Sequence, residues 1–342
     1  MKILTIQNRM GIGDMVIFLP YIEAISKRFD SPVSILVKEN SKAIQFLGDN
    51  KNIDEIIILD RGNKKKNNRH DGFRGSLNLA NDLRKRNFDK VFIFNSSFRF
   101  NLISRIAGIK KIYQYPLFRK KNQHIINTAE EFLKKEIQVN VKSNPQILIN
   151  KEDISEAKSK YKIQNSQLNI LLGIGGSGET KRIPSKIFIE FMELVSKSND
   201  CRFFLATGKN EEEQKILSEI LITKFKDKCI ALDSLSLKEI LPIIKNCKIA
   251  ICNDSSFSHL SSALGIETIV LIAANHTGGT ACNPHRSSSL GDPRADARHE
   301  GCAQTRAAPS TWRHWRSASN RNKPPDSTRI SATHVSHPTS HT

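Results

Sequence analysis

Two kinds of apolar pattern alternate along most of the chain. Short continuous apolar runs are typical of strands buried on both faces, and apolar residues spaced three or four apart are typical of helices. We predict strands at 3–6, 33–37, 56–59, 91–94, 170–172, 203–206, 230–232, 249–252 and 268–272. Helices are predicted at 15–28, 76–86, 99–107, 128–137 and near 150–162. This alternation indicates an α/β protein with parallel sheets.

The predicted elements form two series of similar length. Residues 1–150 predict one Rossmann-like, doubly wound domain, and residues 151–273 predict a second. Open α/β sheets bind ligands at the carboxyl ends of their strands, so we expect a ligand cleft between the two domains.

The composition changes abruptly after this second series. Residues 274–342 hold one lysine, eight arginines and half of the 12 prolines, and only Leu290, Ile330 and Val335 supply aliphatic bulk. So few apolar side chains cannot offset an ordering entropy of about 1–2 kcal/mol per residue. We therefore predict a disordered tail.

Charge and cysteine content narrow the class of protein. The net charge of +19 favours an anionic partner, which nucleic acid, anionic lipid and phosphorylated substrates all satisfy. No run approaches the roughly 18–20 apolar residues of a membrane span, and we expect no signal peptide. The six cysteines show no paired spacing, which indicates a cytoplasmic protein without a zinc site.

Two glycine-rich turns fail the tests for common phosphate motifs. Gly11 and Gly13 begin a dinucleotide fingerprint, but Val16 stands where its third glycine belongs. The loop 173–178 is followed by Glu179 instead of the lysine of a P-loop. An Asp-x-Asp metal clamp is also absent from the sequence. We therefore expect no nicotinamide cofactor and no bound metal.

Polar residues at three strand-to-helix turns carry the candidate chemistry. Asp14 is either a general base or a helix cap. Lys181, after the second glycine loop, is either a diphosphate-binding cation or a solvated charge. The segment 252–260 either builds an anion site at a helix start or is an N-cap with a packed histidine. The run 211–213 is either a charged first helical turn or includes a ribose ligand.

These segments together resemble the lipopolysaccharide heptosyltransferases. The resemblance rests on Ile12-Gly13-Asp14, on Lys181 with Pro184, and most specifically on 254–265. It implies the two-domain GT-B fold and inverting, metal-independent transfer of heptose from ADP-heptose to the lipopolysaccharide inner core. It also implies a cytoplasmic enzyme peripheral to the anionic inner membrane. Asp14 would be the catalytic base, and the implied donor-binding residues are Ser177, Lys181, Glu211 or Glu212, Asp254, Ser255, Ser256 and His259.

Two basic clusters are candidates for acceptor contacts. They are either solvated faces or contacts with anionic core sugars and lipid, and they comprise Lys64, Lys65, Lys66, Arg119, Lys120 and Lys121. One rival function is a GT-B transferase for another nucleotide sugar. The other is a non-enzymatic anion-binding protein whose basic tail engages nucleic acid. We expect no specific nucleic-acid partner, because the tail has no aromatic residues for stacking on bases beyond Trp312 and Trp315.

The resemblance ends near residue 273. The family continues there with a Gly-Pro-Thr-type loop and further helices, whereas this chain continues with Ala273-Ala274-Asn275-His276. The switch from lysine to arginine suggests a frameshift, a chimeric assembly or a truncated gene. We therefore expect an incomplete donor domain.

Overall fold

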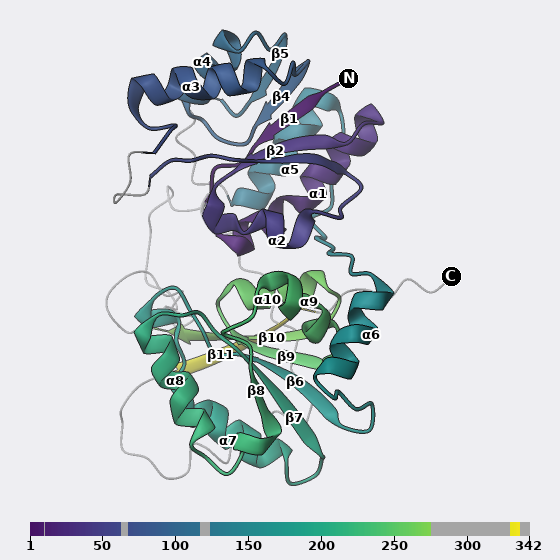
Figure 1. The fold of residues 1–342 in the computed structure, drawn as a ribbon, viewed down its shortest axis with the longest axis vertical. Coiled ribbons are helices and arrows are strands. Elements are labelled where there is room, and N and C mark those ends of the chain that lie inside the picture. Colours follow the sequence, from purple (N-terminus) through teal and green to yellow (C-terminus); the bar gives the residue numbers. More distant parts are fainter. Residues whose placement is uncertain (10, 63–67, 117–123, 275–328, 336–342) are drawn as a thin grey trace, which may run out of the picture.

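The fold consists of two α/β domains stacked one on the other (Figure 1). A computed structural model describes residues 1–9, 11–62, 68–116, 124–274 and 329–335. Each domain contains one twisted sheet with helices on both faces. This arrangement confirms the predicted pair of Rossmann-like domains.

The first sheet has the strand order β3-β2-β1-β4-β5, with all strands parallel. Its strands are β1 (Ile3–Ile6), β2 (Val33–Val37), β3 (Ile53–Ile58), β4 (Lys90–Ile93) and β5 (Lys111–Gln114). Its helices are α1 (Ile12–Phe29), α2 (Ala43–Leu47), α3 (Gly72–Arg84), α4 (Phe98–Ile106) and α5 (Ile125–Ile137). The short edge strand β5 was not predicted.

The second sheet repeats this order in its parallel part, β10-β9-β6-β7-β8. Its parallel strands are β6 (Leu168–Gly173), β7 (Cys201–Ala206), β8 (Cys229–Ala231), β9 (Ile249–Asn253) and β10 (Glu267–Ala274). Its helices are α6 (Lys151–Lys160), α7 (Ser185–Val195), α8 (Glu211–Leu221), α9 (Leu237–Lys245) and α10 (Ser256–Ala263). The 3₁₀ turns are η1 (Glu39–Ser41), η2 (Glu179–Lys181) and η3 (Lys226–Lys228).

Alternate residues of each strand enter different cores. In β1, Ile3 packs on the side of α1 and α5, whereas Leu4 and Ile6 pack under α3 and α4. The core on the α1 side continues into the second domain, where it includes Phe257 and Leu260 of α10. One apolar core therefore joins the two domains.

Specific backbone contacts also hold the domains together. The Ile147 amide donates to the Ala263 carbonyl at 2.9 Å, and the Leu237 amide donates to the Gln45 side chain at 3.0 Å. Figure 1 shows α1 and α2 of the first domain facing α9 and α10 of the second. The starts of α1 and α10 are thus brought to one junction.

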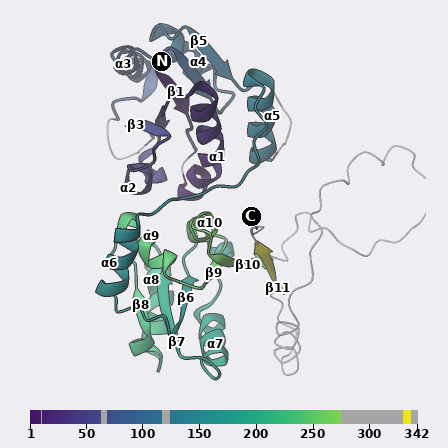
Figure 2. The same cartoon turned by 90° about the vertical axis from the view of Figure 1, so that its right-hand side faces the viewer.

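One segment of the tail differs from the expectation of disorder. Residues Arg329–Val335 form strand β11, which pairs antiparallel with the edge strand β10 (Figure 2). The physical reason is that β10, at the edge of the parallel part of the sheet, offers an open row of backbone hydrogen-bonding groups. Residues 275–328 and 336–342 lie outside the described residues.

No helix in the described part of the chain combines the length and the apolar character needed to cross a membrane.

Candidate active site

The candidate residues lie where the strand order of each sheet reverses. In the first sheet the chain runs from β1 through β2 to β3 at one edge, and then from β4 to β5 at the other edge, so the order reverses between β1 and β4. In the second sheet it reverses between β6 and β9. Ligands of doubly wound sheets bind at these switch points, at the carboxyl ends of the strands. Asp14 follows β1, Lys181 follows β6 and Asp254 follows β9.

Asp14 stands in the first turn of α1. Its Oδ2 accepts a hydrogen bond from the Gly11 amide at 3.4 Å, which is the helix-capping geometry of the alternative interpretation. Its Oδ1 lies 3.6 Å from the Arg9 guanidinium, and 30% of the side chain is exposed. The sequence alone gave no indication that Arg9 pairs with Asp14. The carboxylate therefore caps its helix and still presents an accessible oxygen at the junction.

A cavity of about 220 Å³ opens beside Arg9. Phe18, Phe94 and Tyr115 form its apolar wall, with the ring centroids of Phe94 and Tyr115 5.9 Å apart. Asn8, Asn95 and Thr128 supply its polar groups. An apolar wall with a few polar groups is the usual lining of a small-molecule site, and this one adjoins the residues around Asp14.

Lys181 and Asp254 form an ion pair at the switch point of the second sheet. The Lys181 Nζ lies 2.6 Å from the Asp254 Oδ2, and the side chains are 44% and 45% exposed. The 3₁₀ turn η2 carries the lysine, and the aspartate stands directly after β9, before the N-cap of α10. Because both groups remain half exposed, the pair contributes little to stability and stays open to a ligand.

Helix α10 begins directly after this pair. Ser255 is its N-cap and Ser256 is its first residue, so the first amides of α10 point toward the switch point. Three buried polar atoms near the carboxyl ends of β7 and β9 have no hydrogen-bond partner among the described residues: Thr207 Oγ1, Asn253 Oδ1 and Ser255 Oγ. Unsatisfied buried groups are costly, and a polar ligand at this edge would satisfy them.

His259 joins the two switch points. Its ring lies against Gly13, because a Cβ placed on that glycine would stand 2.6 Å from the His259 Cδ2. Burial lowers the pKa of His259 below its usual 6.5, although the nearby Asp254 and Asp14 carboxylates raise it; the Lys181 ammonium lowers it further. The imidazole is therefore neutral near pH 7 and within the electrostatic reach of all three charged groups.

The glycine loop is held by the last glutamate of the run 211–213. Glu213 is buried and accepts a hydrogen bond from the Gly176 amide at 2.5 Å. Glu212 pairs with Arg182, which also donates to the Gly176 carbonyl at 3.2 Å. Glu211 and Ser177 are exposed at the same edge. Glu213 shares a helix face with the buried Leu217 and Ile220, a spacing that could have revealed it.

Cys252 is close to the site but is no nucleophile. Its side chain is fully buried in β9, and this burial raises the pKa of the thiol to about 12. In the described part of the chain, no three His, Cys, Asp or Glu side chains gather closely enough to hold a metal ion.

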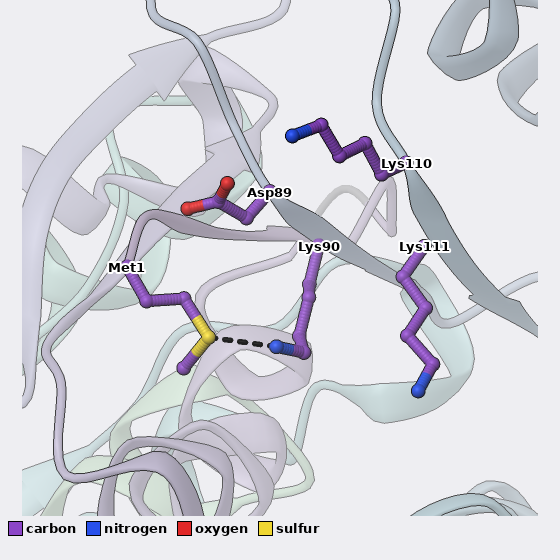
Figure 3. Close-up of a pocket in the computed structure, with 5 residues that line it drawn as sticks. All are labelled: Met1, Asp89, Lys90, Lys110 and Lys111. Carbon is purple, nitrogen blue, oxygen red and sulfur yellow. Dashed lines mark hydrogen bonds between the residues drawn. The ribbon is translucent and has the colours of Figure 1, made fainter.

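The predicted acceptor contacts Lys64, Lys65, Lys66, Arg119, Lys120 and Lys121 lie outside the described residues. A different basic pocket, of about 360 Å³, lies at the amino ends of β4 and β5. Figure 3 shows that its Lys110 and Lys111 point in different directions, while the Lys90 Nζ lies 2.7 Å from the Met1 Sδ. Its cations do not converge on one ligand position, and it is at the opposite end of the strands from Asp14.

The chain is similar to known proteins of one family. Residues 76–304 match the family model for glycosyltransferase family 9 (heptosyltransferase). The chain is 25% identical over 257 residues to lipooligosaccharide heptosyltransferase 2 of Campylobacter jejuni subsp. jejuni. The aligned region covers 70% of this chain and 75% of that protein.

Solved structures show the same fold. The structure of E. coli ADP-heptose LPS heptosyltransferase II matches with a TM-score of 0.62 and 18% identity, covering 79% of this chain and 84% of that one. E. coli heptosyltransferase WaaC with ADP-2-deoxy-2-fluoro heptose matches with a TM-score of 0.57 and 14% identity, covering 79% and 88%. The predicted two-domain GT-B architecture is thereby confirmed.

Proposed function

We propose the sugar donor and the stereochemistry of the transfer that this chain catalyses. The chain belongs to glycosyltransferase family 9, the heptosyltransferases, and is therefore a glycosyltransferase of lipopolysaccharide core synthesis. The donor is ADP-heptose, the acceptor is the lipopolysaccharide inner core, and the transfer inverts the anomeric carbon. The observation that carries this proposal is the meeting of Asp14, Lys181, Asp254 and His259 at the junction of two switch points.

On the acceptor side, Asp14 acts as the general base. Its carboxylate takes the proton of the acceptor hydroxyl as the hydroxyl oxygen bonds to the anomeric carbon of the heptose. The bond from that carbon to the diphosphate breaks at the same time, and ADP leaves with the bonding electrons. The accessible oxygen of Asp14 and the adjoining cavity beside Arg9 support this role.

On the donor side, positive potential stabilises the departing diphosphate. Lys181 supplies a cation, and the first amides of α10, at Ser255 and Ser256, supply hydrogen-bond donors. Asp254 holds Lys181 in place and accepts from sugar hydroxyls, and His259 faces the same space. Ser177 and Glu211 contact the nucleotide; Glu211 is the better of the two predicted glutamates because Arg182 holds Glu212.

The basic clusters 64–66 and 119–121 bind anionic groups of the acceptor in this proposal. The enzyme works in the cytoplasm against the inner membrane, where a lipid-linked acceptor is presented. We place the boundary between acceptor and donor domains near residue 150, because Asn246 of α9 bonds the Ile154 carbonyl of α6 at 3.0 Å.

The test is a donor panel with the full chain. ADP-heptose, UDP-glucose and GDP-mannose are each incubated with a core acceptor, with and without EDTA, and the anomeric configuration of the product is determined by NMR. We expect turnover of ADP-heptose alone, inversion, no effect of EDTA, and loss of turnover in Asp14→Ala. Turnover of another donor instead would identify the rival GT-B activity, and unchanged turnover in Asp14→Ala would refute the mechanism.

A further inference from the structure

Four large apolar side chains are exposed on one face of the first domain. Phe73 and Leu77 of α3 are 76% and 38% exposed, and Phe98 and Leu102 of α4 are 63% and 39% exposed. We call these four residues the α3–α4 face. Both pairs are spaced four apart, so each forms one stripe along its helix.

The face is not needed to build the domain. The opposite sides of the same helices are buried against the sheet, through Leu79 and Leu83 of α3 and Phe100 and Ile103 of α4. The outer stripes therefore come in addition to the core. Adjacent exposed apolar side chains of this size mark an interaction surface more often than scattered single residues do.

The two stripes lie side by side on a rigid base. The Arg99 guanidinium at the start of α4 donates to the His70 carbonyl just before α3. His70 is itself buried, with Nδ1 accepting from the Asp60 amide at 3.1 Å and Nε2 lying 3.2 Å from the Asp82 carboxylate. Both views of the ribbon place α3 and α4 next to each other on the outside of the domain (Figures 1 and 2).

Positive charge surrounds the face. Helices α3 and α4 carry four arginines, and their only acidic residue is Asp82; the arginines are Arg74, Arg84, Arg99 and Arg105. The Arg69 guanidinium already pairs with Asp82, because its Nη2 lies 2.7 Å from the Asp82 Oδ1. This hydrogen bond holds the pKa of Asp82 below its usual value. The arginines of the two helices therefore exceed the acidic groups available to pair with them.

We propose that the α3–α4 face docks the enzyme on an anionic lipid bilayer. Aromatic rings and leucines that enter the headgroup boundary, with arginines around them, are the combination that binds such a surface. This inference rests on the proposed function, since a lipid-linked acceptor brings the enzyme to a membrane. Helices α3 and α4 start at the same carboxyl edge of the sheet as α1, and they cover the face of the sheet opposite to α1.

The experiment measures flotation of the full chain with vesicles. Vesicles of phosphatidylethanolamine and phosphatidylglycerol at 3:1 are compared with vesicles of phosphatidylcholine. The wild type binds the anionic vesicles and loses binding as salt rises. Phe73→Ser with Phe98→Ser weakens this binding about tenfold or more, and each of Arg74→Gln and Arg105→Gln weakens it roughly fivefold. The matched control is Ile222→Ser, which removes an 84% exposed apolar side chain from the second domain and leaves binding unchanged.

The outcomes separate this inference from the proposed function. Asp14→Ala binds vesicles like the wild type but loses turnover. A wild type that does not float, or a double phenylalanine variant with unchanged melting temperature that floats equally well, overturns the docking inference alone. A wild-type dimer that the double variant dissociates also overturns it, because the face would then join two copies of the chain. Vesicle binding without any turnover of ADP-heptose overturns the proposed function alone.

Discussion

The two sheets have the same strand order, yet different side chains stand at their carboxyl edges. The first edge presents one carboxylate, Asp14, with an arginine and an aromatic-walled cavity. The second presents the pair of Lys181 and Asp254 before a helix start with serine hydroxyls. Equal topology with different loop chemistry teaches that each sheet has one switch point, and that the side chains on its turns give each switch point its own chemistry. In our proposal the first edge activates the acceptor and the second holds the donor.

Removing the carboxylate of the first edge has the largest expected effect. Asp14→Asn keeps the shape of the side chain but takes away the proton acceptor, so the turnover number should fall about 10²–10⁴-fold. Initial rates with ADP-heptose at saturating acceptor measure this. A matched change, Asp30→Asn at the other end of α1, should leave the rate unchanged. A rate for Asp14→Asn within threefold of the wild type would mean that the first edge is not the acceptor side.

Removing the cation of the second edge should weaken donor binding more than removing the carboxylate of the first edge does. Lys181→Ala deletes a charge-assisted contact with the diphosphate, worth about 1.5–3 kcal/mol, and the dissociation constant of ADP should rise roughly 10–150-fold. Titration calorimetry measures it. The control is Lys186→Ala, which removes a 68% exposed lysine from the following helix. Equal losses in both variants would show that only general charge matters.

The contact between the edges is tested by crowding it. The added methyl group of Gly13→Ala meets the His259 ring, and such overpacking costs about 1–3 kcal/mol of unfolding free energy. Urea denaturation should show this loss, and adding His259→Ala should recover part of it. Gly178→Ala is the control, because its Cβ meets nothing within 4 Å. If Gly13→Ala has the same unfolding free energy as the wild type, and His259→Ala does not raise it in the double variant, then Gly13 and His259 are not in contact.

The smallest expected effect is a pH dependence from His259. Its pKa is lower in the folded chain than the usual 6.5, chiefly through burial, so the unfolded chain binds more protons below that pH. The resulting stability is present above about pH 6.5 and is lost as the pH falls. Urea unfolding at pH 7.5 and pH 5.5 should show a smaller loss for His259→Gln than for the wild type. Identical losses would contradict this.

Periodicity was sufficient to predict the long elements of both sheets. The buried strands β1, β2, β6 and β9 are apolar runs, and the structure places them where expected. The sequence KIYQ of β5 did not reveal a strand, because an edge strand with flanking lysines lacks a continuous apolar run. The pairing of β11 with β10 was equally hidden, because it depends on an open sheet edge far away in sequence.

The site was only partly predictable for a similar reason. Asp14, Lys181 and Asp254 stand in strand-to-helix connections, where local patterns show them, and the structure brings them to one junction. Arg9 becomes visible only through its partner Asp14. The spacing of Glu213 with Leu217 and Ile220 indicates that this glutamate is buried, but its bond with the Gly176 amide becomes visible only in the structure. An ion pair and a buried carboxylate depend on three-dimensional neighbours, which a single sequence does not display.

The division of labour between the edges is tested most directly by the ADP dissociation constants of Asp14→Asn and Lys181→Ala, measured side by side by calorimetry. We expect Asp14→Asn to bind ADP within about twofold of the wild type, and Lys181→Ala to bind it at least tenfold more weakly. Weakened ADP binding in Asp14→Asn together with unchanged binding in Lys181→Ala would contradict it.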